Sequence, residues 1–513
     1  MHPHHICIQP AMHFSLYPFI FSFLSLFLFL VFLLKWLSIT ARPPRKNPPP
    51  SPRKLPLIGN LHQMGPFPHR SLHSLSQIHG PLMLLHFAAS PVLVISSSSA
   101  AREIMKTHDL IFSNRPKLTL WEKLMYGAKD VAFSPYGEYW RQMKSICVLQ
   151  LLSNKRVQSF RDVREEETAL MIEKISGSGC DVVNLSKLIE ELMGNVVCRV
   201  ALGQKYGGGR GGARRGFKEV LGEGAELLGV FDIGDFVPWL KWVNRVNGVY
   251  GRAERIAKEL DEFLEGVVEE HEGRERKVGE EGGQDFVDVL LEIQRENVVG
   301  IPLHRDSVKA LILDVFAGGT DTTSTALEWV MTELLKHPQA MKKLQAEVRL
   351  IAQPNKPVTE DDLDQMPYLK AVIKETLRLQ PPGPLIVPRE STKDVQVMGY
   401  DIAAGTRVIV NAWAIGHDPT SWDEPEEFRP ERFLNCPVDF RGHDFELIPF
   451  GAGRRGCPGI QFAVAVNELA VANLVHKFDF ALPDGVELDV SEVAGTTVHK
   501  KFPLLLVATH WSC

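Results

Sequence analysis

Hydrophobic residues recur at intervals of three and four along most of the chain, and this spacing predicts amphipathic helices. The pattern is clearest over residues 100–107, 138–151, 155–176, 185–202, 338–351, 359–363 and 367–379. It also runs unbroken over residues 306–336, far longer than the usual helix of about three turns. We expect this long helix to cross the whole domain that contains it.

Short apolar and β-branched stretches predict a minor β component. Two strands are expected at residues 82–86 and 92–95, around a turn at residues 88–91. Two more are expected at residues 395–398 and 406–410, joined by a turn at Ala404 and Gly405. The patterns together predict a mainly α fold with a minor β region (α+β), in which one domain occupies residues 57–513.

The N-terminal segment differs from the rest of the chain. Residues 14–34 contain no charged residue and are mostly Phe and Leu. At about 1.5 Å per residue they would span roughly 30 Å, the thickness of a bilayer core. Lys and Arg follow this stretch and none precedes it, which predicts a cytosolic main domain. We therefore expect a transmembrane helix within residues 1–37 and a Pro-rich basic hinge over residues 38–56. The alternative, a cleaved signal peptide, lacks a small-residue cleavage site.

Composition narrows the class of protein. The 513 residues are 44% hydrophobic and 23% charged, as in globular proteins. The net charge of -5 gives no reason to expect a nucleic-acid partner. The seven cysteines are odd in number and widely scattered, which favours a reducing compartment over a disulfide framework.

One cysteine, Cys457, lies in a loop crowded with glycine and arginine, Phe-Gly-Ala-Gly-Arg-Arg-Gly-Cys-Pro-Gly over residues 450–459. It could be a buried structural thiol. The loop's glycines fit G-x-G-x-x-G, but no βαβ unit follows them. A zinc site would need a second ligand at short spacing, and Cys436 is too distant. A thiolate presented this way could also be the axial ligand of a haem, where it favours O–O cleavage.

The middle of the long helix reads Ala-Gly-Gly-Thr-Asp-Thr-Thr over residues 317–323. Two interior glycines cost roughly 1 kcal/mol each relative to alanine, and they leave room for a ligand. The Thr322 hydroxyl could hydrogen-bond that ligand while Asp321 relays protons. Alternatively, the glycines admit a neighbouring helix and the threonine bonds back to the preceding turn.

Two further constellations combine opposite charges or donors on one helix face. Glu375 and Arg378 are three residues apart among apolar neighbours, and a buried pair would need more partners, for which Arg432 is a candidate. Trp140 and Lys144 are four residues apart and offer an indole N–H and a cation, which could bind a carboxylate.

These segments match the motifs of a known family. The Cys457 loop fits F-x-x-G-x-R-x-C-x-G, and Glu375 with Arg378 fits E-x-x-R. Residues 430–433 fit the segment that completes that triad, and residues 318–323 fit [A/G]-G-x-[D/E]-T-[T/S]. In order and spacing, over essentially its whole length, the chain resembles the cytochrome P450 family of haem-thiolate monooxygenases, in its plant microsomal branch of specialised metabolism.

The resemblance implies roles for individual residues. Cys457 would bind the iron of haem b, Thr322 would hydrogen-bond dioxygen, and Asp321 would help to deliver protons. The haem propionates would be held by Arg455, Trp140, Lys144 and Arg389, and the structural triad would comprise Glu375, Arg378 and Arg432. Lys144 departs from the family's usual arginine, and a lysine cannot form a bidentate fork.

The resemblance also implies a reaction and its partners. The enzyme would use dioxygen, with electrons from NADPH through a separate flavoprotein reductase, to hydroxylate or otherwise oxidise a small lipophilic plant metabolite at the endoplasmic reticulum membrane. Terpenoids, phenylpropanoids or coumarins, and oximes are the candidate classes. Pocket walls would come from residues 121–133, 230–239, 315–319, 385–387 and 493–497. A basic docking face near the Cys457 loop would comprise Arg454, Arg455, Lys144, Arg141, Lys155 and Arg156. Two alternatives remain: a reductase-independent isomerase or dehydratase on the same fold, and a non-catalytic haem protein.

Overall fold

The computed structural model describes residues 22–27, 29–31, 47–179, 181–205, 216–274, 284–296, 300–353 and 356–511. The chain divides into two units, Met1–Asn47 and Pro48–Cys513. In the first unit the described residues 22–27 and 29–31 are helical. Most of the predicted transmembrane span lies outside the described residues, and no helix within them is long and apolar enough to cross a bilayer.

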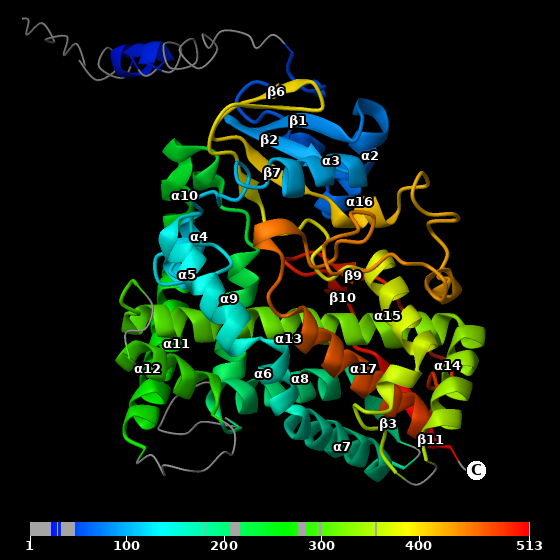
Figure 1. Cartoon of the computed structure of the whole chain (residues 1–513). Coiled ribbons are helices and arrows are strands. Elements are labelled where there is room, and N and C mark those ends of the chain that lie inside the picture. The colour runs from blue at the N-terminus through cyan, green and yellow to red at the C-terminus, as the bar shows by residue number, and fades with distance from the viewer. Residues whose placement is uncertain are drawn as a thin grey trace, which may run out of the picture. The chain divides into compact units, whose positions relative to one another are not determined.

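The second unit is built mainly from helices, with α13 running through it (Figure 1). Their bounds are α2 Pro68–His79, α3 Ser98–Arg102, α4 Thr119–Leu124, α5 Glu138–Ile146, α6 Asn154–Ser159, α7 Arg161–Gly177, α8 Leu185–Leu202, α9 Phe217–Leu228, α10 Lys241–Val246, α11 Val249–Glu272, α12 Phe286–Glu296, α13 Arg305–Lys336, α14 Pro338–Ile351, α15 Pro367–Leu379, α16 Ala412–Gly416 and α17 Ile460–Lys477. The predicted long helix is confirmed as α13, which packs against α8, α15 and α17.

The strands form small sheets, and the largest lies at one end of the unit in Figure 1. Their bounds are β1 Leu82–Phe87, β2 Ser90–Ile95, β3 Val182–Asn184, β4 Arg389–Glu390, β5 Val395–Val397, β6 Tyr400–Ile402, β7 Arg407–Val410, β8 Phe478–Ala481, β9 Glu492–Val493, β10 His499–Lys500 and β11 Leu505–His510. The sheets have the orders β1-β2-β7-β4, β3-β11-β8, β5-β6 and β9-β10, and only the β2–β7 pair is parallel among the described strands.

Local chemistry explains where the central helices begin and end. The Asn184 side chain caps α8 by accepting a hydrogen bond from the Lys187 N–H, and Gly203 ends it in the left-handed region. Helices α14 and α15 each begin with a proline, whose missing N–H costs nothing in the first turn. These boundaries fix α8 and α15 beside α13, where the largest hydrophobic core forms.

Several predicted elements differ in detail. The predicted helices over residues 100–107 and 138–151 both end in π-helical turns, Glu103–Thr107 and Cys147–Leu151. The helix predicted over residues 155–176 is broken at Phe160, which leaves helical geometry and packs its ring against Phe286.

Two predictions are wrong. Residues 359–363 form a turn rather than a helix: Thr359 donates to Asp362 as in a helix cap, but only a 3₁₀ turn at Leu363–Gln365 fits before Pro367. The strand at residue 395 pairs with β6 across Met398 and Gly399, not with β7. The turn at Gly405 instead carries the chain from β6 to a different sheet.

Candidate active site

The Cys457 loop folds back on itself immediately before α17. The N–H of Cys457 donates to the Phe450 carbonyl at 3.0 Å, and the N–H of Gly459 donates to Cys457 Sγ at 3.3 Å. Gly453 has a φ of +67°, and a side chain there would collide with the Met105 carbonyl at 2.2 Å, so this glycine is required by both conformation and space.

The thiol itself is surrounded by protein without being packed against it. Its residue is exposed by surface area, yet burial raises the pKa of Cys457. The Gly459 N–H and the charge of Lys144 oppose that rise. The two observations agree if Sγ faces a space inside the protein rather than the outer surface. The simple interpretation as a packed structural thiol therefore does not fit.

The middle of α13 is also open, although most of the helix is buried. Gly318 is exposed, and a Cβ there would meet nothing within 4 Å. A Cβ on Gly319 would lie 3.5 Å from Val197 of α8, so this glycine does serve helix packing. The Thr322 hydroxyl donates to the Gly318 carbonyl at 2.6 Å, the back-bond considered as an alternative. One glycine faces open space and the other faces a neighbour.

The backbone of Val131 joins the Cys457 loop to α13. Its N–H donates to Asp314 of α13 at 2.6 Å. Its carbonyl accepts hydrogen bonds from Trp140 Nε1 at 3.0 Å and from Arg455 at 3.2 Å. Arg455 precedes Cys457 by two residues, so this single residue holds the loop and the open helix in a fixed relation.

Arg455 is one of three buried guanidinium groups that lie close together. It donates to the carbonyls of Ser113 at 2.7 Å and Ser134 at 2.6 Å and lies 4.1 Å from the centre of the Trp140 ring. Burial, followed by the charge of Arg389, lowers the pKa of Arg455 to about 9.

The other two members are Arg389 and Arg115. Arg389 is 1% exposed and pairs with Asp109 at 3.2 Å, while its Nε has no hydrogen-bond partner among the described residues. Arg115 was not predicted from the sequence, because it belongs to no motif and only the fold brings it to Arg455. Burial and the two neighbouring arginines lower its pKa well below the ordinary value. The three guanidinium groups outnumber the two carboxyl groups near them, Asp109 and Asp130, and the remaining positive charge favours an anionic ligand.

Lys144 lies beside the thiol. Its Nζ donates to the Gly456 carbonyl at 2.5 Å. Burial lowers the pKa of Lys144, whereas the proximity of Cys457 opposes this shift. Lys144 also interacts electrostatically with Asp314, so it stands between the Cys457 loop and α13.

The structure brings together the three residues of the predicted triad, Glu375, Arg378 and Arg432. Arg378 donates to both carboxylate oxygens of Glu375 at 2.8 Å, and Arg432 donates to one of them at 2.9 Å. The side chains of Glu375 and Arg378 are 0% exposed. Arg378 also donates to the carbonyls of Gly416 and Pro425, which satisfies the buried guanidinium. The pair is thus a buried network and not a surface ion pair.

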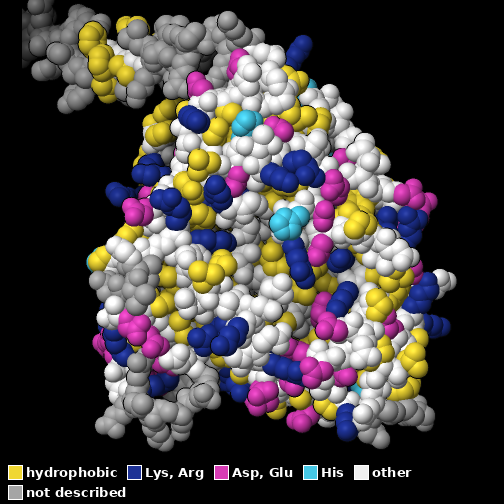
Figure 2. All heavy atoms as spheres, viewed as in Figure 1, with side chains coloured by type: hydrophobic (Ala, Val, Ile, Leu, Met, Phe, Trp, Pro, Cys, Tyr) yellow, Lys and Arg dark blue, Asp and Glu magenta, His cyan; other side chains and the backbone are white. Residues whose placement is uncertain are grey.

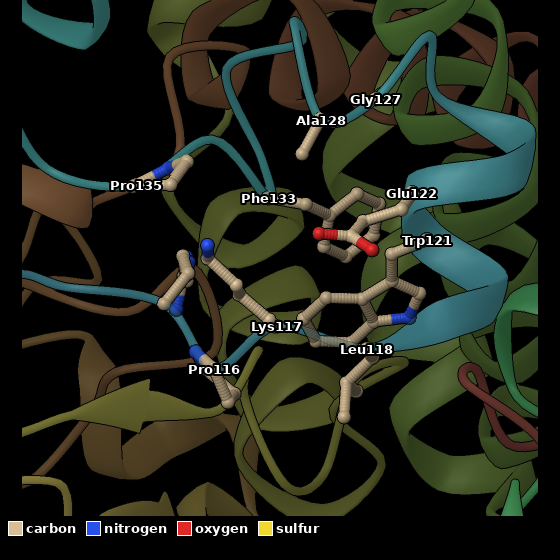
Figure 3. Close-up of a pocket in the computed structure, with 10 residues that line it drawn as sticks. Pro116, Lys117, Leu118, Trp121, Glu122, Gly127, Ala128, Phe133 and Pro135 are labelled. Carbon is tan, nitrogen blue, oxygen red and sulfur yellow. The ribbon is translucent and has the colours of Figure 1, made fainter. Parts of the chain in front are cut away.

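A cleft of about 140 Å³ opens elsewhere, between Arg115 and Pro135 (Figure 3). The Trp121 and Phe133 rings form part of its wall, with centroids 4.1 Å apart. None of its lining residues belongs to α13 or to the Cys457 loop. The cleft is smaller than typical ligand sites. It lies beside Arg115 of the arginine cluster and shares Trp121 and Phe133 with the predicted pocket wall over residues 121–133.

The family model for cytochrome P450 matches residues 49–505. The chain belongs to the cytochrome P450 family. It is 60% identical over 493 residues to cytochrome P450 736A117 of Prunus mume, covering 95% of both chains. It is 54% identical to norfluorocurarine oxidase of a Strychnos species and to a 3-beta-hydroxylase of Tanacetum parthenium, covering 96% of this chain in each case and 99% and 98% of those relatives.

Solved structures agree with this P450 assignment. A zebrafish cytochrome P450 structure with abiraterone has a TM-score of 0.72 and 26% identity and covers 87% of this chain and 100% of its own. A second zebrafish structure, with progesterone, has a TM-score of 0.74 and 27% identity. It covers 86% of this chain and 99% of its own. The P450 fold and monooxygenase class follow.

The site's residues fit the P450 cofactor, a haem with a thiolate ligand. The Cys457 residue keeps accessible surface, and the buried Arg389 retains an Nε–H without a partner among the described residues, which suits a propionate. When bound, haem supplies the activation of dioxygen and the cleavage of its O–O bond.

Proposed function

We propose that this P450 hydroxylates or otherwise oxidises a small lipophilic plant metabolite, using NADPH electrons delivered by a separate flavoprotein reductase. The observation that carries the proposal is the pairing of an unpacked thiol with an open turn of α13, joined through Val131. Relatives named as an oxidase and a hydroxylase support the reaction type. The solved relatives with abiraterone and progesterone support a lipophilic substrate.

Several of the proposed substrate walls contact one another or the Cys457 loop. Trp121 Nε1 donates to the Leu228 carbonyl at 3.1 Å, so the segment of α4 meets the end of α9. A Cβ on Gly229 would collide with Thr496, which brings the C-terminal segment to the same place. Ile386 lies 3.5 Å from the Cβ position of Gly451 in the Cys457 loop. The groups on these walls are mainly apolar or small, which favours terpenoids, phenylpropanoids, coumarins or oximes.

Each site residue then has a proposed role. Cys457 ligates the haem iron, and Lys144 with the Gly459 N–H favours its thiolate form. Arg455, Arg389 and Trp140 hold the propionates, and we add Arg115 to that set. Their present carbonyl partners would be exchanged for the carboxylates.

The oxygen side of the site is assigned to α13. Thr322 would turn its hydroxyl from the Gly318 carbonyl to the bound oxygen, and Asp321 would supply protons. Glu375, Arg378 and Arg432 stabilise the scaffold and take no part in the reaction.

The reductase would dock on exposed basic residues near the Cys457 loop. Arg454 is 50% exposed, and Arg141 and Lys155 are exposed as well. Two predicted members are wrong for this role, because Arg455 is buried and Lys144 is bonded to Gly456. Basic and acidic side chains are interspersed over the face in Figure 2, so a local contact is expected rather than a broad basic field. Residues 14–34 would anchor the protein in the endoplasmic reticulum membrane.

The test is product formation from a panel of these metabolite classes, with and without NADPH and reductase. Substrates are first selected by optical difference titration. Product that requires NADPH, reductase and dioxygen, with one ¹⁸O atom incorporated from ¹⁸O₂, supports the proposal. Product formed without reductase would indicate the isomerase or dehydratase class instead. Binding of every class without any turnover would favour a non-catalytic haem protein.

A further inference from the structure

The Asp321 side chain is connected to the C-terminal segment of the chain. The Thr497 hydroxyl donates to one carboxylate oxygen of Asp321. The same hydroxyl oxygen lies 2.6 Å from Nε2 of His499, and that nitrogen is 3.4 Å from the other Asp321 oxygen. Nδ1 of His499 lies 2.8 Å from the hydroxyl of Thr325, one turn further along α13. Asp321, Thr497 and His499 therefore form a continuous hydrogen-bonded series, which we call the Asp321–His499 chain.

The middle of the series is covered and its two ends are accessible. Thr497 is only 4% exposed, whereas the His499 and Asp321 side chains are 38% and 32% exposed. Thr497 bridges the two partly exposed groups, whose nearest atoms lie 3.4 Å apart. A proton entering at His499 has only one hydroxyl to cross.

Charged groups from two helices lie near His499. Helix α8 contributes Glu190, and α13 contributes Asp321 and Glu328. Lys500 of β10 interacts with Glu328. Burial raises the pKa of both Glu190 and Glu328, and His499 opposes each rise. Three carboxyl groups therefore surround one imidazole.

We propose that Thr497 and His499 form the route by which solvent protons reach Asp321. The inference rests on the proposed monooxygenase function, because inserting one oxygen atom consumes two protons as the second atom leaves as water. The Thr497 hydroxyl lies between Asp321 and Nε2 of His499, which suits a concerted transfer of two protons. Thr497 gives its proton to Asp321 and takes one from Nε2 of the His499 imidazolium. The products are a carboxylic acid and a neutral imidazole protonated at Nδ1, which then regains a proton from water.

A structural role for the same contacts is the competing explanation, since they also fasten β10 to α13. His499→Gln and Thr497→Val separate the two, with His79→Gln in α2 as a matched control outside the series. Reduced carbon monoxide spectra and optical substrate titrations of all variants first establish that haem and substrate still bind.

The first measurement is coupling, the product formed per NADPH consumed. We expect His499→Gln and Thr497→Val to lower it on the order of tenfold, less than the 10²–10⁴-fold typical of losing a general acid itself. The missing electrons should appear as hydrogen peroxide, and the solvent isotope effect on turnover should increase. His79→Gln should match the wild type. Wild-type coupling and isotope effect in both series variants would overturn the proposal, whatever their stability.

The second measurement needs neither reductase nor substrate. Histidine NMR of the reduced carbon monoxide complex, assigned by comparison with His499→Gln, reports the ring-nitrogen signals of His499. Asp321→Asn replaces the carboxylate that accepts from Thr497, so the contact of Thr497 with Nε2 and the Nε2 signal should change. The His79 signals should not change. Unchanged His499 signals contradict the proposal even if the enzyme is a monooxygenase, and changed signals with no NADPH-dependent product would place the failure in the proposed function instead.

Discussion

The ammonium group of Lys144 donates a hydrogen bond to the carbonyl oxygen of Gly456 at 2.5 Å. It therefore holds the residue that immediately precedes Cys457. The family usually has arginine at this position, and the sequence led us to expect a weaker propionate contact. The structure gives the lysine a direct hold on the loop that carries the thiol.

Lys144→Met should loosen that loop. It keeps the apolar stem but leaves a buried carbonyl without a donor, at a cost of about 1–3 kcal/mol. It also removes the charge that lowers the pKa of Cys457. We expect a lower haem-to-protein ratio after purification and a lower unfolding midpoint. Lys144→Arg, the matched variant, should keep the haem-to-protein ratio and the unfolding midpoint of the wild type. Equal haem content in all three proteins would contradict this role.

Cys457→Ser should abolish the red-shifted Soret band of the reduced carbon monoxide complex, because an alcohol cannot replace the thiolate donor. Turnover with reductase should be lost as well. Cys436→Ser provides the control, since Cys436 lies outside the loop. If Cys457→Ser still oxidised substrate, the assignment of the ligand would be wrong.

The Glu375 network should be essential for stability. Arg378→Gln leaves Glu375 buried without its principal partner, and breaking such pairs costs about 3–5 kcal/mol. Little folded protein is expected, measured as the soluble haem-containing fraction.

Arg429→Gln is the matched control for that network. Its side chain pairs with Asp423 at the surface, 36% exposed, so its loss should cost less than about 1 kcal/mol. The soluble haem-containing fraction is compared between the two variants. Similar losses for both would refute the importance of burial.

The two glycines of α13 should respond differently to alanine. Both substitutions should stabilise the helix by up to about 1 kcal/mol. The Gly319 methyl would make ordinary contact with Val197, whereas the Gly318 methyl would project into open space. We expect Gly318→Ala alone to weaken substrate binding in optical titrations. Unchanged binding would mean that the opening does not hold substrate.

Glu468 of α17 should make stability depend on pH. Burial raises the pKa of Glu468 from 4.5 to about 7. The folded state then binds more protons than the unfolded state between these values, so the free energy of unfolding falls as pH rises through this window. The shift corresponds to at most about 3 kcal/mol. Glu468→Gln should flatten the profile and be more stable above pH 7. Exposed Glu487→Gln should leave the profile unchanged.

Periodicity alone predicted the helices whose boundaries carry strong local signals. Helix α8 has an asparagine cap and a terminal glycine, and α15 starts and stops at prolines. The break at Phe160 carries no such signal, because a tertiary contact with Phe286 decides it. The short strand β6 was missed because its three residues are too few to show alternation.

The site was predictable where one segment carries a motif and unpredictable where separate segments meet. Cys457, Glu375 and Asp321 stand in recognisable local patterns. Arg115 does not, and only the fold places it beside Arg455 and Arg389. The same applies to Thr497 and His499, which reach Asp321 from the opposite end of the sequence.

The segment before β10 serves two neighbours at once. Thr496 abuts the end of α9, in the proposed substrate wall, while Thr497 is bonded to Asp321. Thr496 is therefore selected for the fit to substrate, whereas Thr497 is selected for its hydrogen bond to Asp321. When lineages diverge toward new metabolites, we expect residues 493–496 to diversify freely and residue 497 to keep a hydroxyl. A comparison of orthologues and paralogues should show that boundary as an abrupt change in substitution rate between two consecutive codons.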